Sequence, residues 1–284
     1  MSRPRSRAIA PIIGLAVVVA ACSSGTPSSS GSTTTTTTSS VPLAAGARYV
    51  ALGSSYAAGI GIPTQSDGAC ARSSHNYASL VAAELHLSLV DVTCSGATTA
   101  NVLTTAQGKN PPQIDAVTTG TSLVTFTVGG NDIGYTAMAL ACGARSAACT
   151  SDPAQVAASL ATLTTSLTTM ISTIRARAPS ARIVMVTYPR LVPPVSCPAL
   201  DFTPEGDQIV GAMGRGLEQV FVTVARATHV LVADPYVLGA THGPCAPTAV
   251  RWIAGHTVSV GFPYHPTPLG HQEMAALTER ALQG

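Results

Sequence analysis

The amino-acid sequence predicts an α/β protein, a three-layer α/β/α sandwich in which helices cover both faces of a parallel sheet. Two observations predict this class: five short apolar or β-branched runs recur along the chain, and segments with helical periodicity lie between them. Strands and helices therefore alternate in the order that right-handed crossovers between parallel strands require.

The five expected strands are short and rich in Val, Ile, Leu and Thr, which favour extended backbone. Their apolar residues are nearly continuous, with little alternation, as in strands that are buried on both faces of a parallel sheet. In chain order these runs are residues 49–52, 87–92, 123–128, 182–187 and 230–232.

Three expected helices have apolar residues at steps of three and four, which place those residues on one face. Each begins with a polar capping residue followed by a proline, which suits the first helical position. The capping pairs are Asp152-Pro153, Thr203-Pro204 and Thr267-Pro268. The apolar faces are Val156, Leu160, Leu163, Leu167, Ile171 and Ile174; Ile209, Met213, Leu217, Val220 and Val224; and Met274, Leu277 and Leu282.

The first strand ends at Gly53, followed by Ser54 and Ser55. Ligands of open α/β sheets bind beyond the carboxyl ends of the strands. A serine at such a strand-to-helix turn can point its hydroxyl into the crevice, while its amide stays free because the first amides of a helix have no partner within it. The alternative is a structural serine, since serine is also a common capping and turn residue.

The third strand ends in Gly129-Gly130-Asn131-Asp132. The two glycines allow the backbone to approach a ligand closely, and the Asn131 amide is a neutral donor that can stabilise a developing oxyanion. Ordinary turn chemistry is the alternative interpretation of these residues.

His265 lies just ahead of the third capped helix, on a loop that Pro266 stiffens. An imidazole in that position can be held at a fixed distance from the end of the first strand. The chain has seven histidines, and a structural role is the alternative for any one of them.

Residues 1–22 have the pattern of an export signal. Arg3, Arg5 and Arg7 precede an apolar run of 14 residues, 8–21, which is too short to span a membrane that needs about 20. The run ends in Val19-Ala20-Ala21-Cys22, which resembles the bacterial lipobox, where the cysteine is acylated before the signal is cut ahead of it. We therefore expect a lipoprotein anchored through Cys22 to the outer face of the cytoplasmic membrane. An ordinary secretory signal is the alternative, and would leave the protein secreted or in the cell wall.

Residues 23–40 are almost entirely Ser, Thr and Gly and cannot bury apolar surface, so a flexible tether is expected before a folded domain at 41–284. The whole chain is 46% hydrophobic, which is enough for a core and excludes a disordered protein. Removal of Arg3, Arg5 and Arg7 with the signal leaves 12 of the 15 cationic residues against 13 anionic ones, which gives a net charge of −1. A nucleic-acid partner is therefore excluded.

Six cysteines remain after Cys22: Cys70, Cys94, Cys142, Cys149, Cys197 and Cys245. An even number in an exported chain implies disulfides, and six cysteines allow 15 pairings. A zinc site is the alternative, but no Cys-x-x-Cys pair occurs, so no metal is expected. The sequence also lacks a Gly-x-Ser-x-Gly elbow, a phosphate loop, a dinucleotide fingerprint and an HExxH motif, so no cofactor is expected.

Four short blocks follow one another between residues 49 and 271: Gly53-x-Ser55, Cys94-Ser95-Gly96-Ala97, Gly129-Gly130-Asn131-Asp132, and His265-Pro266 with Gly270-His271. This order resembles the GDSL or SGNH hydrolases, and most closely their secreted, disulfide-bonded actinobacterial esterase and lipase branch. The resemblance implies the SGNH hydrolase fold, with a flavodoxin-like sheet of five parallel strands, and a serine carboxylic ester hydrolase.

The resemblance also implies the role of each site residue. Ser55 is the expected nucleophile and His265 the expected general base and then acid. The expected oxyanion hole combines the Ser55 amide, the Gly96 amide and the Asn131 side chain. The disulfides of this branch imply pairs between successive cysteines, Cys70–Cys94, Cys142–Cys149 and Cys197–Cys245, of which the first lies beside Gly96.

The sequence departs from the family pattern at two positions. Ser54 stands where the family has an aspartate, and Phe262 stands where it has the catalytic acid, three residues before the histidine. We expect the Phe262 carbonyl to accept the His265 Nδ1 proton, which gives a Ser–His dyad. Asp234, at the end of the last expected strand, is the one candidate carboxylate to replace that acid, although an Asp before a Pro usually initiates a turn. His271, in the first turn of a helix, is expected to be structural.

The predicted protein is thus an exported, lipid-anchored monomeric esterase that acts on a lipid, an acylated glycan or a small ester. Residues 134–151 and 189–204 are expected to be loops that shape the acyl pocket. A base near its ordinary pKa of about 6.5 would make activity rise through that pH. The alternatives are a binding lipoprotein with a decayed site, suggested by Ser54 and Phe262, and an acyltransferase with the same nucleophile.

Overall fold

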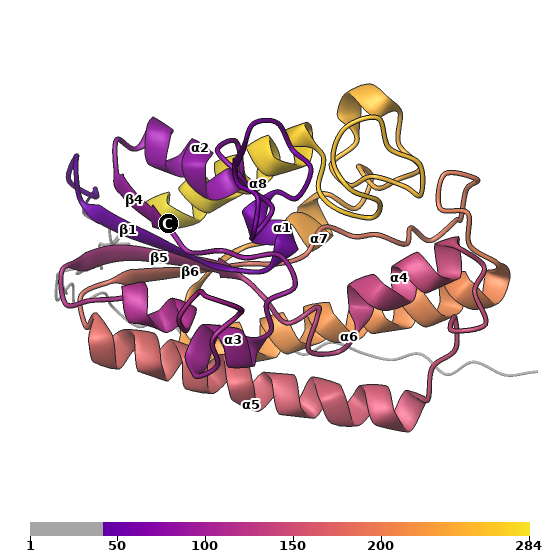
Figure 1. Ribbon diagram of the computed structural model, residues 1–284, viewed down its shortest axis with the longest axis horizontal. Helices are drawn as coiled ribbons and strands as arrows, with labels where there is room; N and C mark the ends of the chain where they lie inside the picture. Colours follow the sequence, from indigo (N-terminus) through magenta and orange to yellow (C-terminus); the bar gives the residue numbers. More distant parts are fainter. Residues whose placement is uncertain (1–41) are drawn as a thin grey trace, which may run out of the picture. The chain divides into compact units, whose positions relative to one another are not determined.

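The computed structural model describes residues 42–284 and confirms the predicted sandwich around five parallel strands (Figure 1). The strand order across the sheet is β4-β1-β5-β6-β7, and every neighbouring pair is parallel. Each strand begins and ends within two residues of its predicted bounds. The strands are β1 (Arg48–Gly53), β4 (Ser88–Asp91), β5 (Thr121–Thr127), β6 (Arg182–Val186) and β7 (Leu231–Ala233).

Helices cover both faces of the sheet, as Figure 1 shows. On one face lie α2 (Tyr77–Glu84) and α8 (Pro268–Gln283), and on the other α5 (Pro153–Arg177) and α6 (Pro204–Thr228). Alternate residues of each strand enter the two cores, so β1 sends Val50 and Leu52 to one and Tyr49 and Ala51 to the other. Burial on both faces explains why the strand runs are apolar without alternation.

The three predicted helix starts are confirmed by their capping hydrogen bonds. The side chains of Asp152, Thr203 and Thr267 accept from backbone amides in the first turns of α5, α6 and α8, each of which has a proline at its start. Arg175 and Arg177 lie in the last turn of α5 and stabilise its carboxyl end, because the helix dipole attracts cations there. Local chemistry therefore sets the ends of the long helices.

Several short elements had no clear signal in the sequence. They are α1 (Ser55–Ala58), the hairpin of β2 (Gln65–Asp67) and β3 (Arg72–Ser73), α3 (Thr99–Leu103), α4 (Tyr135–Gly143), α7 (Pro235–Leu238), and the 3₁₀ turns η1 (Gln113–Ala116) and η2 (Thr248–Val250). The expectation of a loop at 134–151 is wrong over the nine residues of α4. The apolar side chains of α4 are distributed around the whole helix, so its sequence lacks the one-sided apolar pattern of most surface helices.

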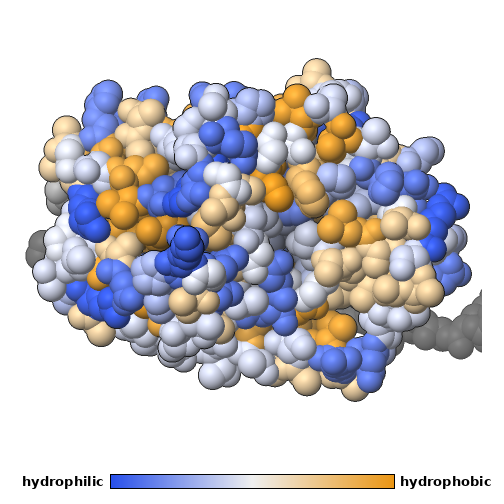
Figure 2. All heavy atoms as spheres, in the orientation of Figure 1, coloured by the Kyte–Doolittle hydropathy of each residue, from blue (hydrophilic) through white to orange (hydrophobic). Residues whose placement is uncertain are grey.

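The three disulfides implied by the resemblance are present: Cys70–Cys94, Cys142–Cys149 and Cys197–Cys245. Because the six cysteines of residues 42–284 are all paired, none of them offers a thiolate to zinc. Hydrophilic and apolar side chains are interspersed over the surface in Figure 2. Between residues 42 and 284, no helix is long and apolar enough to cross a membrane. The predicted signal, Cys22 and the tether lie outside the described residues.

Candidate active site

Ser55 is the first residue of α1, directly after the turn that ends β1. The turn requires glycine at position 53, where φ is +139° and an added Cβ would lie 2.5 Å from the Thr127 carbonyl oxygen. Ser55 is 6% exposed, and its Oγ lies 2.9 Å from Nε2 of His265. Residues 210 positions apart in the chain therefore meet at hydrogen-bond distance.

The orienting acceptor for His265 is the carbonyl of Pro263, so the expectation of the Phe262 carbonyl is wrong. His265 Nδ1 lies 2.8 Å from the Pro263 oxygen, whereas the Phe262 oxygen accepts from the His265 backbone amide. That backbone bond closes a tight turn, which leaves the Pro263 carbonyl facing the ring. A carbonyl only accepts, so Nδ1 carries the proton and Nε2 presents its lone pair to the Ser55 hydroxyl.

Burial controls the protonation of His265. The residue is 2% exposed, and loss of hydration lowers its pKa to about 4, while the hydrogen bond to the Pro263 carbonyl acts in the opposite direction. The expectation of a base near its ordinary pKa of about 6.5 is therefore wrong. At neutral pH the imidazole is uncharged, which is the form that can accept a proton from Ser55.

The three expected oxyanion donors occupy two turns and the start of α1. Asn131 Nδ2 donates to the Ala97 carbonyl at 2.8 Å, which joins the turn after β5 to the Gly96 loop and leaves its second hydrogen unused. Gly96 is exposed, with φ +83°. Within residues 42–284, the amides of Ser55 and Gly96 donate to no other group. All three groups therefore have a hydrogen available for a ligand.

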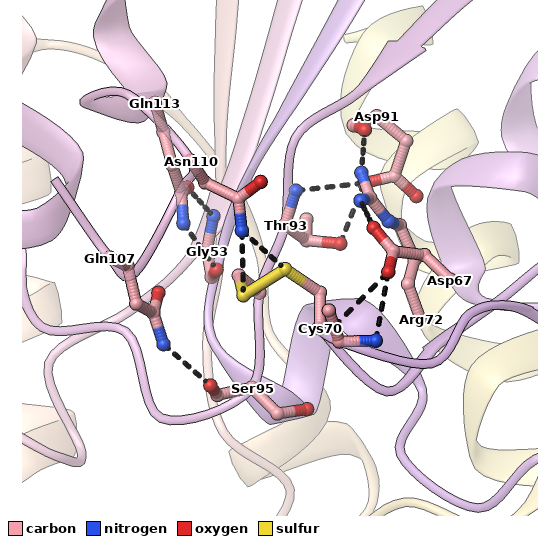
Figure 3. The surroundings of a disulfide bond; sticks show 12 residues. Gly53, Asp67, Cys70, Arg72, Asp91, Thr93, Ser95, Gln107, Asn110 and Gln113 are labelled. Carbon is pink, nitrogen blue, oxygen red and sulfur yellow. Dashed lines mark hydrogen bonds and ion pairs between the residues drawn. A yellow bond between two sulfur atoms is a disulfide. The ribbon is translucent and has the colours of Figure 1, made fainter.

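The Cys70–Cys94 disulfide joins the Gly96 loop to the turn between β2 and β3 (Figure 3). The Cys94 amide donates to the Gly53 carbonyl at 3.0 Å, and the Ser95 amide donates to the Cys70 carbonyl at 2.9 Å. On the other side of the loop, Gln107 Nε2 donates to the Ser95 carbonyl at 2.8 Å. The loop next to Gly96 is therefore fixed both covalently and by hydrogen bonds.

Gln113 holds the backbone of Gly53 from the opposite side (Figure 3). Its Oε1 accepts from the Gly53 amide at 2.7 Å, and its Nε2 donates to the Gly53 carbonyl at 3.0 Å. The side chain is buried, so both bonds are protected from water. No motif marks Gln113 in the sequence, because the pairing depends on a 3₁₀ turn 60 residues away.

Two tyrosines outside the predicted motifs also shape the site. Tyr56 donates to the Tyr264 carbonyl, and its ring centroid lies 4.6 Å from that of His265. Tyr188 follows the end of β6, and its hydroxyl accepts from the Gly130 amide at 2.9 Å. The position of Tyr188 at a strand end was a usable signal, since the other site residues follow strand ends as well.

Ser54 and Tyr188 form a weakly bonded pair behind the nucleophile. Ser54 is buried, and its Oγ lies 3.5 Å from both the Tyr188 hydroxyl and the Thr127 carbonyl. These distances are at the limit for a hydrogen bond. The strong hydrogen bond of this pair is therefore the one by which Tyr188 holds Gly130 in the Asn131 turn, and residue 54 adds little to it.

Replacement of Tyr188 by phenylalanine should lower kcat roughly 10-fold with little change in KM. The Gly130 amide would lose its acceptor in a buried site, and a displaced Asn131 would stabilise the transition state less well. Tyr135→Phe is the matched control, because Tyr135 is buried in the same aromatic cluster and its hydroxyl makes no hydrogen bond within the described residues. Equal kcat values for the two variants would contradict this role for Tyr188.

Asp234 and His271 do not join the site. Asp234 accepts from the Val237 amide at 2.9 Å and caps α7, which confirms the turn role. His271 is fully buried, and its Nδ1 accepts from the Tyr77 amide at 3.2 Å, which confirms a structural role. Neither side chain forms a hydrogen bond with Ser55 or His265 within the part of the chain that the structure describes.

Residues 51–273 match the model of the GDSL-like Lipase/Acylhydrolase family. Lipase 2 of Streptomyces coelicolor is 32% identical over 253 residues, which are 81% of this chain and 84% of the relative. A lipase of Streptomyces rimosus is 30% identical over 82% of this chain and 86% of its own length.

Two solved structures agree with these relatives. The extracellular lipase of S. rimosus has 29% identity and a TM-score of 0.66, over 82% of this chain and 99% of its own. Phospholipase A1 of Streptomyces albidoflavus has 28% identity and the same TM-score, over 84% and 100%. The family model covers most of the folded part, from β1 into α8. The chain therefore belongs to the GDSL-like lipase/acylhydrolase family of serine carboxylic ester hydrolases.

Proposed function

We propose that this ester hydrolase acts through a dyad in which Ser55 is the nucleophile and His265 is the general base and acid. The observation that carries the proposal is the pair of contacts on one imidazole, 2.9 Å from Nε2 to Ser55 Oγ and 2.8 Å from Nδ1 to the Pro263 oxygen. In this geometry the base, His265, contacts the nucleophile on one side of its ring and the orienting carbonyl on the other.

The reaction follows from these positions. His265 Nε2 takes the proton of the Ser55 hydroxyl as Oγ attacks the ester carbonyl carbon. The resulting oxyanion is stabilised by the amides of Ser55 and Gly96 and by the Asn131 side chain. The imidazolium then protonates the leaving alcohol, and the acyl group remains on Ser55. In the second half, His265 takes a proton from the water molecule that attacks the acyl carbon. The imidazolium then returns this proton to Ser55 Oγ as the bond between Oγ and the acyl carbon breaks, and the acid is released.

The Pro263 carbonyl performs only one of the two roles that a catalytic carboxylate has beside a histidine base. The Pro263 oxygen fixes the tautomer and the ring orientation, but it carries no full charge to stabilise the imidazolium. The low pKa of His265 agrees with this absence, because no acidic group is among its causes. The intact contacts of Ser55 and His265 favour catalysis over the binding lipoprotein with a decayed site.

We also propose that the protein is exported and held on the outer face of the cytoplasmic membrane through acylated Cys22. The three disulfides support export, because such bonds persist in oxidising compartments. The basic start, the short apolar run and the small residues before Cys22 support lipidation. The folded domain would then act at the membrane surface, monomeric, on a tether of residues 23–40.

The nucleophile is tested by trapping. A nitrophenyl alkylphosphonate should release one equivalent of nitrophenol, inactivate the protein and add one phosphonyl group, located on Ser55 by peptide mass analysis. Ser159, which is more exposed than Ser55 and lies in α5, provides an internal comparison because no base between residues 42 and 284 contacts it. Modification of another serine together with loss of activity would refute the assignment of Ser55.

A further inference from the structure

His271 is a buried ionisable side chain that the proposed reaction does not use. It lies near the start of α8, a few residues after His265, and none of its surface is exposed. Loss of hydration and, to a lesser extent, the neighbouring His265 lower the pKa of His271 to about 3. The ring is therefore neutral at pH 7 and well below it, and it lies close enough to His265 for the two side chains to interact.

The hydrogen bond of the His271 ring determines which nitrogen carries its proton. The Tyr77 amide donates to Nδ1 at 3.2 Å, so Nδ1 has a lone pair and the hydrogen of the neutral ring is on Nε2. Nε2 is buried, and no group between residues 42 and 284 accepts from it. A buried donor without a partner is unfavourable, and an apolar side chain would avoid this cost. The acceptor at Nδ1 is therefore the property that favours histidine over an apolar residue at this position.

The Nδ1 bond joins the start of α8 to the start of α2. The Tyr77 amide is the first of α2 and has no acceptor within that helix. Helices α2 and α8 lie side by side on one face of the sheet (Figure 1). Because a hydrogen bond is directional and apolar packing is not, this bond fixes the position of α8 along α2.

The His271 ring also lies next to the short helix that carries Ser55. A Cβ added to Gly59 would be 3.4 Å from Nε2 of His271. Gly59 ends α1 with φ +78°, and its amide donates to the Ser55 carbonyl at 3.0 Å. His271 therefore lies against the residue that holds the main chain of the proposed nucleophile.

The start of α8 fixes the position of the proposed base as well. Thr267 caps this helix two residues after His265, and its carbonyl accepts from the His271 amide at 2.9 Å. A shift of α8 along α2 would therefore move His265 relative to Ser55. The 2.9 Å contact between Nε2 of His265 and Oγ of Ser55 tolerates little movement, because a misplacement of about 1 Å can lower a rate by about 100-fold.

We propose that His271 is a positioning residue, which keeps Ser55 and His265 at hydrogen-bond distance. It does so through its bond to the Tyr77 amide and its contact with Gly59. The inference rests on the proposed function, because it concerns the alignment of the dyad. Within the described residues, the His271 side chain forms no hydrogen bond with Ser55 or His265, so it acts through α8 and α1.

The test uses two polar variants of the full-length protein that separate the roles of the two ring nitrogens. In His271→Asn the side-chain oxygen takes the place of Nδ1 and can accept from the Tyr77 amide, whereas in His271→Gln the amide group reaches the place of Nε2. On nitrophenyl butyrate, His271→Gln should lower kcat roughly 10-fold with KM within about 2-fold, and His271→Asn should keep both within about 3-fold of the wild type. Rates are expressed per serine titrated with the nitrophenyl alkylphosphonate, so unfolded protein does not lower them.

Thr278→Val is the matched control. Thr278 is also fully buried on α8, and its hydroxyl donates to the Met274 carbonyl of the same helix at 2.7 Å. Its replacement should lower the thermal midpoint and leave kcat per titrated serine unchanged.

Three results would overturn the proposal: equal kcat values for His271→Asn and His271→Gln, a loss that appears in KM instead of kcat, or an equal loss of kcat in Thr278→Val. A loss of about 10-fold or more in His271→Asn would also overturn it, whether or not His271→Gln folds. Failure of the phosphonate to label Ser55 in the wild-type protein would instead refute the proposed function, and this proposal with it.

Discussion

Replacement of Ser55 by alanine should lower kcat by roughly 10⁴- to 10⁶-fold, with little loss of folded protein. Within residues 42–284, the Ser55 hydroxyl is the only nucleophile that the His265 imidazole contacts, at 2.9 Å, and its removal leaves water to attack without an acyl-enzyme. The side chain is small, and its loss leaves the turn at Gly53 and the Gln113 clamp intact. The measurement is steady-state and burst kinetics on nitrophenyl butyrate, with the thermal midpoint recorded for each variant.

His265→Ala should have an effect of similar size, and the double variant should be scarcely slower than either single one. Groups that act as one unit lose their joint contribution when either is removed, so the effects do not add. Additive losses for the two changes would show that the two residues act independently, and would contradict the dyad.

Ser54→Ala is the matched control for Ser55→Ala. The two serines are neighbours and both are buried, but Ser54 Oγ has only contacts of 3.5 Å. We expect its replacement to change kcat by less than about 3-fold. A loss at position 54 as large as that at position 55 would show that the turn tolerates no change, and would remove the evidence for a nucleophile.

The sequence predicted those parts of the molecule that depend on local chemistry. The strands were predictable because burial on both faces requires continuous apolar runs. The long helices were predictable because a capping residue precedes each of them and a proline is its first residue. Ser55 and His265 were selected because strand ends and stiff loops are the places where an α/β sheet presents chemistry. The contact between them required the family resemblance, since spacing alone does not bring residues 55 and 265 together.

The predictions that were wrong or missing concern features that depend on tertiary packing. Helix α4 was missed because it has apolar residues on every side, and Gln113 because its partner lies 60 residues away. The acceptor for His265 was misplaced by one residue, from Pro263 to Phe262, because the path of a tight turn decides which carbonyl faces the ring. The pKa of His265 was misjudged because burial is a property of the assembled protein.

The activity should be nearly independent of pH from about 5 to 8 and should fall below about pH 4.5. Loss of hydration lowers the pKa of His265 to about 4, so the protonated form is disfavoured and the neutral base predominates at every higher pH. Below the pKa, the fraction of neutral base, and with it kcat/KM, falls about 10-fold per pH unit. If His265 had the ordinary histidine pKa of about 6.5, the activity would instead begin to fall at about pH 6.5.

Acid unfolding must be separated from this titration, because the same shift affects stability. The pKa of His265 in the folded protein lies below the unfolded value of about 6.5, so its contribution to stability is present above pH 6.5 and is lost as pH falls toward 4. Rates are therefore measured within seconds of a pH jump from neutral buffer, and circular dichroism under the same conditions shows whether the protein is still folded.

Phe262→Ala tests the physical cause of the shift. The Phe262 ring meets the His265 ring edge to face at 5.1 Å and shields it on one side. Its removal admits water, which stabilises the imidazolium, so the acid limb of kcat/KM should move upward by roughly one pH unit while the plateau is kept. The variant targets burial because burial has a larger effect on the pKa of His265 than the hydrogen bond to the Pro263 carbonyl. A wild-type limb near pH 6.5, or a limb that stays in place in Phe262→Ala, would show that burial by this ring does not set the pKa of the base.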